Sequence, residues 1–424
     1  MPPTLPVTMV RWWPQGGLWR HPDFLRLWGA QVGSAFGSRI TRTALPIIAV
    51  LIHATAAEVA VLAALGVAPG VLVGLFAGGY VDRARRLPLL VGADLVRALL
   101  ILTIPAAAYA GWLSMPQLYL VAALVAAATT LFQIADSSFL PTLVGRELLV
   151  EGNARLGATD SVAETAGPGI AGILIQLLTG PVAVIVDALS YLWSALLLSR
   201  IRTPEARSAA TAREGSMWDD ARAGFRACLA DRLVRPLLLA DAVAMFFGGF
   251  FMALYIVLYM ETLRLPPAAV GLVISVGGVG AFAGALLAGP LGRVRRTGAA
   301  MIASLALGQA AMLFLPLAAY AGRFAIVCLV AQQLVGDGFL AAYRIHAISL
   351  RQRVLPDATM GRANATFHVV IGIALPAGAL VAGPLAGVIG VVPALWIGTT
   401  GGLLAVPVLL ASPLPRLRPD LSHG

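Results

Sequence analysis

The sequence predicts an all-α membrane protein of twelve spanning helices, arranged as two similar six-helix bundles. First, the 424-residue chain is 59% hydrophobic and only 12% charged, with a mean hydropathy of +0.87. A soluble domain carries roughly 25% charged residues, so most of this chain is expected inside lipid. Second, apolar runs of about 20 residues, the length of a spanning α-helix, recur along it. Third, its two halves resemble each other.

The spans are predicted from these apolar runs, in which Pro and Gly are tolerated because membrane helices accommodate both. We expect them at residues 24–52, 58–80, 88–110, 117–139, 154–178, 181–199, 234–261, 267–290, 298–320, 323–349, 362–387 and 391–411. The predicted organisation is a segment 1–23, a bundle 24–199, a linker 200–233, a bundle 234–411 and a tail 412–424.

Orientation is predicted from the arginines, which gather in alternate connections. The opposite connections hold only Arg264 and Arg323. This bias predicts that the arginine-rich side and both termini are cytoplasmic. The net charge of +10 follows from the same bias, so we do not interpret it as nucleic-acid binding. All 30 basic residues are arginine, which is typical of a GC-rich bacterial genome, and the expected location is the bacterial cytoplasmic (inner) membrane.

The linker contains one amphipathic segment. Trp218, Ala221, Phe225 and Leu229 follow helical spacing, with charges on the other face. Such a helix is expected to lie on the inner leaflet. The alternative is a simple tether between the bundles.

An internal repeat supports duplication. "GGYVDRARR" (78–86) recurs as "AGPLGRVRR" (288–296), 210 residues later, with Asp82 replaced by Gly292. Asn153 recurs 211 residues later as Asn364, and a Gly-Pro pair occurs in the span after each. Parallel six-helix halves around a central cavity are one architecture of secondary transporters.

The segment 78–86 resembles the pattern G-x-L-x-D-R-x-G-R-R of the major facilitator superfamily, with Tyr80 for Leu and Arg85 for Gly. Longer stretches such as "GADLVRALL" and "DALSYLWSALLLSRIR" are similar to its bacterial drug and siderophore efflux branch, which includes macrolide exporters and the enterobactin exporter. The resemblance implies a latch in which the aspartate docks near the start of span eleven; for the arginines, a role in topology alone is the alternative. The implied latch residues are Gly78, Asp82, Arg83 and Arg86.

A glycine-proline pattern in span five resembles the motif of proton-driven antiporters. It comprises Gly167, Pro168, Gly169 and Gly172. Glycines allow close helix approach, and proline removes a backbone donor. The resemblance implies export driven by protons.

Ionisable residues within spans cost about 2.5–3.5 kcal/mol each on insertion scales, so each needs a reason. Asp160 and Glu164 lie four residues apart on one face of span five and are candidates for proton coupling, as is Asp337 in span ten. The alternative for Glu164 is a static salt bridge to Arg39 or Arg42. We expect Asp94 and Arg97 to form a structural pair and Asp187 to be structural. Candidates for the substrate cavity are Arg39, Arg42, Gln133, Asp136, Asp241, Phe246, Phe250, Gln333, Arg344 and His368.

The predicted function is proton-coupled export of a small amphipathic compound, such as a drug-like molecule, a siderophore or another metabolite, by alternating access. Uptake of a nutrient or lipid fragment is the alternative direction. An enzyme is not predicted, because no nucleophile–base set, metal cluster or nucleotide loop is recognisable; accordingly no cofactor and no metal are expected. Cys228 and Cys328 suggest neither a disulfide nor a metal site. The expected partners are a small-molecule substrate, protons and the lipid bilayer; the protein is expected to be a monomer.

Overall fold

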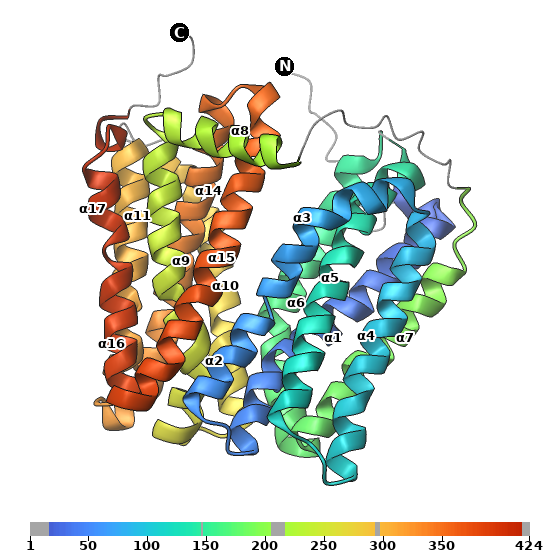
Figure 1. Cartoon of the computed structure of the whole chain (residues 1–424), viewed down its shortest axis with the longest axis horizontal. Coiled ribbons are helices and arrows are strands. Elements are labelled where there is room, and N and C mark those ends of the chain that lie inside the picture. Colours follow the sequence, from blue (N-terminus) through green and yellow to red (C-terminus); the bar gives the residue numbers. More distant parts are fainter. Residues whose placement is uncertain (1–16, 146, 205–216, 293–296, 418–424) are drawn as a thin grey trace, which may run out of the picture.

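The computed structural model describes residues 17–145, 147–204, 217–292 and 297–417, and the regular structure in these ranges is helical. Within them, eleven helical segments are long and apolar enough to cross a membrane. The twelfth spanning helix is α1 (Pro22–Leu51), which is 30 residues long and carries Arg39 and Arg42 near its middle. The predicted twelve-helix, two-bundle fold is confirmed (Figure 1).

The first bundle contains six spans, one of which is divided in two. Its remaining helices are α2 (Ala56–Leu65) and α3 (Ala68–Arg83), which together form the second span, α4 (Arg86–Tyr109), α5 (Met115–Val144), α6 (Leu149–Leu178) and α7 (Gly180–Ser199).

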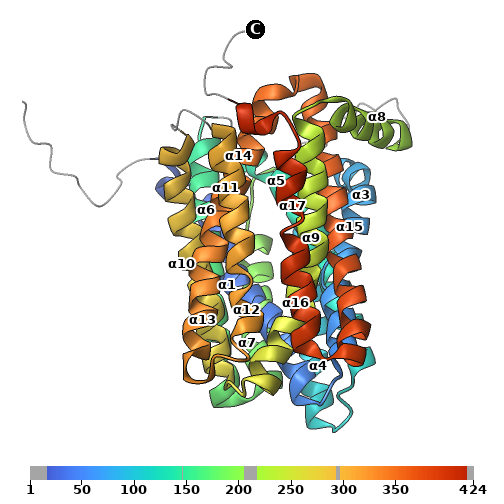
Figure 2. The same cartoon turned by 90° about the vertical axis from the view of Figure 1, so that its left-hand side faces the viewer.

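The second bundle repeats this plan with more interruptions, including two π-helical segments, η2 and η4. Its elements are α9 (Val234–Val257), η2 (Leu258–Thr262), α10 (Pro267–Gly292), α11 (Thr297–Ala311), α12 (Phe314–Leu317), η3 (Gly322–Phe324), α13 (Ala325–Ala331), η4 (Gln332–Gly336), α14 (Asp337–Val354), α15 (Asp357–Ile389), α16 (Val391–Gly402) and α17 (Ala405–Leu410). Figure 2 shows this bundle from its outer side. Two short 3₁₀ helices, η1 (Gly17–Arg20) and η5 (Leu414–Arg416), flank the whole set.

Glycines on α1 allow it to pack closely against α7. Gly29, Gly33 and Gly37 recur every four residues, so they share one face of the helix. A Cβ at Gly37 would lie 2.1 Å from Ser190 Oγ, so a larger residue there would displace side chains of α7. Membrane helices associate through such small residues because lipid supplies no hydrophobic drive for their contact.

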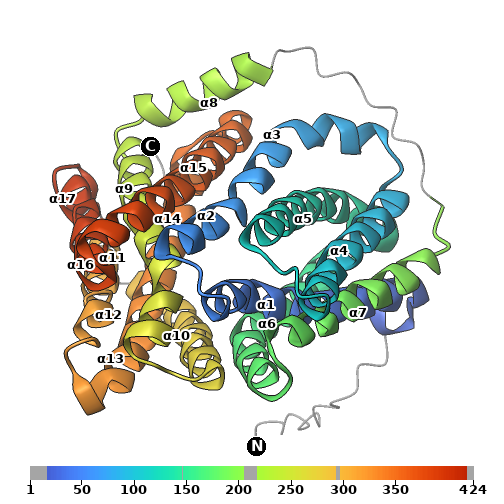
Figure 3. The same cartoon turned by 60° about the horizontal axis from the view of Figure 1, so that its bottom comes forward.

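Helix α8 (Met217–Ala230) precedes the second bundle and lies across one end of it (Figures 1 and 3). We call this end of the molecule the α8 end and the opposite one the far end. α8 packs against α15 through Gly224, whose Cβ would lie 2.6 Å from the carbonyl oxygen of Arg362, and through Cys228. The Cys228 Sγ lies 3.9 Å from the Ala363 carbonyl oxygen, and its burial raises the pKa of the thiol.

The two bundles contact each other mainly through α6 with α10 and through α2 with α15. Their ribbons converge at the far end and diverge toward the α8 end (Figure 1). The contacts agree with this shape, because they involve the later part of α6, the first part of α10 and the first part of α2. At the far end, Gln176 Oε1 accepts a hydrogen bond of 3.2 Å from the Ala268 amide.

Candidate functional site

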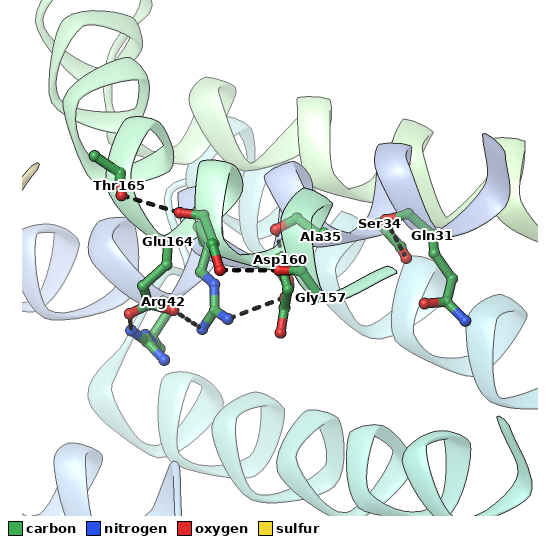
Figure 4. Close-up of polar contacts among 11 residues, drawn as sticks. Gln31, Ser34, Ala35, Arg42, Gly157, Asp160, Glu164 and Thr165 are labelled. Carbon is green, nitrogen blue, oxygen red and sulfur yellow. Dashed lines mark hydrogen bonds and ion pairs between the residues drawn. The ribbon is translucent and has the colours of Figure 1, made fainter. Parts of the chain in front are cut away.

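A network of two arginines and two acids joins α1 to α6 near the middle of both spans (Figure 4). Arg39 Nη1 lies 2.7 Å from Glu164 Oε2, and Arg39 Nη2 lies 3.3 Å from Asp160 Oδ1. Arg42 Nη2 lies 2.5 Å from the other Glu164 oxygen. The structure thus brings together four of the predicted site residues, and Glu164 bridges both arginines.

The glycine-proline pattern of α6 makes room for this network. A Cβ at Gly167 would lie 2.4 Å from Arg39 Cβ, so glycine allows α1 to approach at that level. Pro168 has no N–H, and the carbonyl one turn earlier, that of Glu164, therefore lacks its usual helical donor. A polar carbonyl is left beside the charged network.

The network faces the second bundle. The charge of Arg42 acts on Tyr255 of α9, and the charge of Glu164 acts on Asp337 of α14. The side chains of Arg42 and Glu164 are 60% and 44% exposed, and that of Asp160 is 66% exposed. Charged groups at this depth are too costly to expose to lipid. Their exposure toward the other bundle therefore indicates a water-accessible space between the bundles.

Asp337 is the acid of the second bundle on which the charge of Glu164 acts. It begins α14 directly after the π-helical segment η4, and π segments within helices are frequent at functional sites. Gly277 lies against it, since a Cβ there would lie 2.3 Å from Asp337 Oδ2. The charge of Arg344, which is exposed, also acts on Asp337.

Two further predicted residues have partners that sequence reasoning missed. Gln31 Nε2 donates a hydrogen bond of 2.6 Å to Asp136 Oδ1, linking α1 to α5. In the second bundle, the Tyr343 hydroxyl donates one of 2.8 Å to Asp241 Oδ1, linking α14 to α9. Gln31 and Asp241 are 210 residues apart, which is the repeat offset, whereas their partners Asp136 and Tyr343 are 207 apart, so the repeat relates only one member of each link.

The remaining cavity candidates lie in different environments. Gln133 and His368 are exposed on α5 and α15. Gln333 is buried, and its amide donates to the carbonyl oxygens of Val273 and Ile274, at 3.4 and 3.3 Å. Phe250 is only 2% exposed and packs against Gly398 of α16, while Phe246 is half-buried with its backbone against α15.

The later residues of the glycine-proline pattern face α10 of the other bundle. The Gly169 amide donates a hydrogen bond of 2.8 Å to Ser275 Oγ. A Cβ at Gly172 would lie 2.3 Å from the Pro267 carbonyl oxygen. In the second copy, a Cβ at Gly383 of α15 would lie 2.5 Å from Ala60 Cβ of α2. Both Gly-Pro helices therefore form the contact between the bundles.

The predicted latch is only partly visible. Gly78 lies in α3, and the side chains of Asp82 and Arg83 lie outside the described part of the chain. Arg86 Nη1 lies 3.5 Å from Thr142 Oγ1 of α5, within the first bundle.

Twelve spanning helices in two duplicated bundles, with charged residues facing the space between them, define a membrane transporter. A family model supports this, since the description "Major Facilitator Superfamily" matches residues 27–378. The chain belongs to the major facilitator superfamily.

Solved structures of similar fold include transporters with different cargo. A bacterial homologue of the iron transporter ferroportin, inward-facing, has a TM-score of 0.73 at 18% identity and covers 93% of this chain and 99% of its own. The nucleoside transporter NupG has a TM-score of 0.69 at 13% identity, and the match covers 92% of this chain and 98% of that one. A bacterial homologue of the human lysosomal transporter Spinster has a TM-score of 0.67 at 13% identity, and the match covers 93% of this chain and 96% of that one. At these identities the likeness is one of fold. A comparison with curated protein sequences gave no match.

Proposed function

We propose that the protein is a proton-coupled secondary transporter that exports a small amphipathic compound by alternating access. The observation that carries the proposal is the exposed network of Arg39, Arg42 and Glu164 in the middle of the spans. Ionisable groups at this depth mark substrate or ion pathways. The family membership supports transport and argues against an enzyme.

We further propose that the structure is an inward-facing state. The bundles contact each other at the far end, and by the distribution of arginines the α8 end is cytoplasmic. The comparison supports the same state: the ferroportin homologue gives a TM-score of 0.73 for its inward-facing structure and 0.54 for its outward-facing one.

The residues around the space favour a ligand with an anionic group and an apolar body. Arg42 and Arg344 are exposed cations, and a planar guanidinium pairs well with a carboxylate or phosphate. Phe251 and Tyr255 stack with ring centroids 4.8 Å apart, close to the charge of Arg42. An aromatic surface of this kind suits an apolar ligand body.

Ligand and proton would compete at Glu164. An anionic ligand that binds Arg42 or Arg39 removes an ion-pair partner from Glu164. Loss of a nearby positive charge favours the protonated carboxyl. Conversely, protonation of Glu164 removes its negative charge and so breaks its ion pairs with the two arginines. Such competition at one site moves ligand and proton in opposite directions.

Flux in proteoliposomes with an imposed pH gradient tests the proposal. Candidate ligands come from a screen of the purified protein by tryptophan fluorescence against metabolites and drugs. Export predicts that ligand accumulates on the acidic side, opposite to proton flow, and that Glu164→Gln abolishes accumulation. Accumulation on the alkaline side would indicate symport and hence uptake, and ligand movement that ignores the gradient would contradict proton coupling.

A further inference from the structure

The core of the first bundle contains a second set of charges, away from the exposed network. Asp94 and Arg97 lie on α4, and Asp187 lies on the neighbouring helix α7. Asp94 and Asp187 are 0% exposed and Arg97 is 3% exposed.

The guanidinium of Arg97 is held on both faces. Its Cζ lies 4.5 Å from the centroid of the Phe132 ring and 4.2 Å from that of Tyr191. Its Nη2 donates to Asp94 Oδ1, while its Nε has no hydrogen-bond partner. The two aromatic rings thus fix the guanidinium beside Asp94.

The second oxygen of each aspartate is left without a partner. Asp94 Oδ2 and Asp187 Oδ2 accept no hydrogen bond, although Asp187 Oδ1 accepts one of 3.2 Å from Ser190. The hydroxyls of Thr41 and Ser194 also have no hydrogen-bond partner, although Thr41 lies close to Asp187 and Ser194 close to Asp94. Buried polar atoms in native proteins are nearly always satisfied, so these oxygens are expected to acquire a donor, either from the two neighbouring hydroxyls or from a bound proton.

The charges do not balance if both aspartates are ionised. Among the described residues, Arg97 is the only cation whose charge acts on Asp94 or Asp187. The other titratable groups facing them are Tyr191 of α7, a neutral phenol at neutral pH, and Asp136 of α5, which adds to the negative side. A buried carboxylate without a partner is strongly unfavourable.

We propose that the cluster of Asp94, Arg97 and Asp187 is a proton-binding site, in which the two carboxyl groups share one proton in this conformation. One proton leaves a single carboxylate to balance Arg97. It also gives one of the unpartnered carboxyl oxygens an O–H group. A neighbouring hydroxyl or carboxylate oxygen can accept the hydrogen bond that this group donates. The proton does not belong to the Glu164 network, where two arginines face two acids.

Helix α1 covers this site and connects it to the exposed network. A Cβ at Gly37 would lie 2.5 Å from Asp187 Oδ1, so α1 lies directly on the carboxyl group. The same helix carries Arg39 and Arg42, which contact α6. A shift of α1 against α7, as the bundles rock, would open the site to water. Its role in coupling rests on the proposed function; its occupancy by a proton does not.

Infrared spectroscopy of the purified protein tests occupancy without any ligand. Wild type is expected to show a protonated-carboxyl band at neutral pH, and Asp187→Asn and Asp94→Asn are each expected to lose the same part of it. The double variant loses no more than either single variant, because one proton is shared. Glu164→Gln is the matched control, and it keeps this part of the band. Thermal unfolding confirms that each variant is folded.

Three outcomes would overturn the proposal. The first is a protonated-carboxyl band that neither single variant changes. The second is that the losses from the two single variants add up to two carboxyl groups. The third is a band that appears only when sodium is removed, which would mean that the site holds sodium. The role in coupling is tested separately in proteoliposomes. Asp187→Asn is expected to retain ligand exchange but to lose accumulation driven by a pH gradient. If Asp187→Asn still accumulates ligand in a pH gradient while the infrared result is as expected, the site binds a proton but has no role in coupling.

Discussion

Gly172 of α6 and Gly271 of α10 lie face to face at the contact between the bundles. A Cβ at Gly172 would lie 3.0 Å from Gly271 Cα, and a Cβ at Gly271 would lie 2.9 Å from Gly172 Cα. The two backbones therefore meet where neither residue can carry a side chain without displacement. In the proposed inward-facing state, this contact contributes to the closed far end.

Substitution at this contact should shift the protein away from the closed far end. We expect Gly271→Ala and Gly172→Val to destabilise this conformation by about 1–3 kcal/mol, because overpacking forces the backbones apart. That corresponds to a change of roughly fivefold to 150-fold in the ratio of states. Distances between spin labels at the far ends of α6 and α10 measure the shift. Gly157→Ala is the control, since nothing lies within 4 Å of a Cβ there; equal distances in all variants would contradict the prediction.

Removing an arginine from the exposed network and removing its acid should change ligand affinity in opposite directions. Arg39→Ala is expected to weaken binding of an anionic ligand about tenfold or more, since one charge-assisted contact is lost. Glu164→Gln should instead tighten binding, because it frees the guanidinium of Arg42 and leaves Asp160 as the only acid beside Arg39 in the network. Titration of tryptophan fluorescence gives the Kd values. Arg323→Ala, an exposed arginine outside the network, should bind like wild type; weaker binding by Glu164→Gln would mean that the acid itself contacts the ligand.

The hydrogen bond between Tyr343 and Asp241 should contribute to stability. Tyr343→Phe leaves the Asp241 carboxyl group without its donor, and a buried acceptor that loses its partner costs about 1–3 kcal/mol. A lower midpoint of thermal unfolding in detergent is the expected result. Tyr109→Phe provides the comparison, because Tyr109 is 97% exposed. Equal midpoints for the two variants would mean that the bond contributes nothing.

Cys228 should react slowly with maleimide while α8 remains docked on α15. Its raised pKa leaves less thiolate at neutral pH, and the reaction should accelerate as the pH rises toward that pKa. Mass spectrometry of a Cys328→Ser variant follows the labelling of Cys228 alone. Fast labelling of the folded protein would show that α8 leaves its place on α15.

The sequence was sufficient to predict the spans, because bilayer thickness imposes a length and the arginines mark alternate connections. The observed helices begin and end within a few residues of the predicted ones, as for α7 at Gly180–Ser199 against 181–199. The Gly-Pro pairs noted in spans five and eleven both lie on helices that contact the other bundle.

The partners of charged side chains were harder to predict, because they depend on helix rotation and depth. Sequence reasoning considered a salt bridge from Glu164 to Arg39 or Arg42, and the structure shows both. It treated Asp187 as structural without placing it near Arg97, which requires the packing of α4 against α7. The Tyr343 link to Asp241 was missed because tyrosine in a span gives no charge signal.

Labelling of position 42 from each side of the membrane tests the inward-facing arrangement most directly. The Arg42→Cys variant, with Cys228 and Cys328 replaced by Ser, is treated with a membrane-impermeant thiol reagent in inverted and in right-side-out vesicles. We expect labelling only in inverted vesicles, where the α8 end faces the reagent. Labelling only in right-side-out vesicles, or none in either, would contradict a water-accessible space open to the cytoplasm beside Arg42 and Glu164.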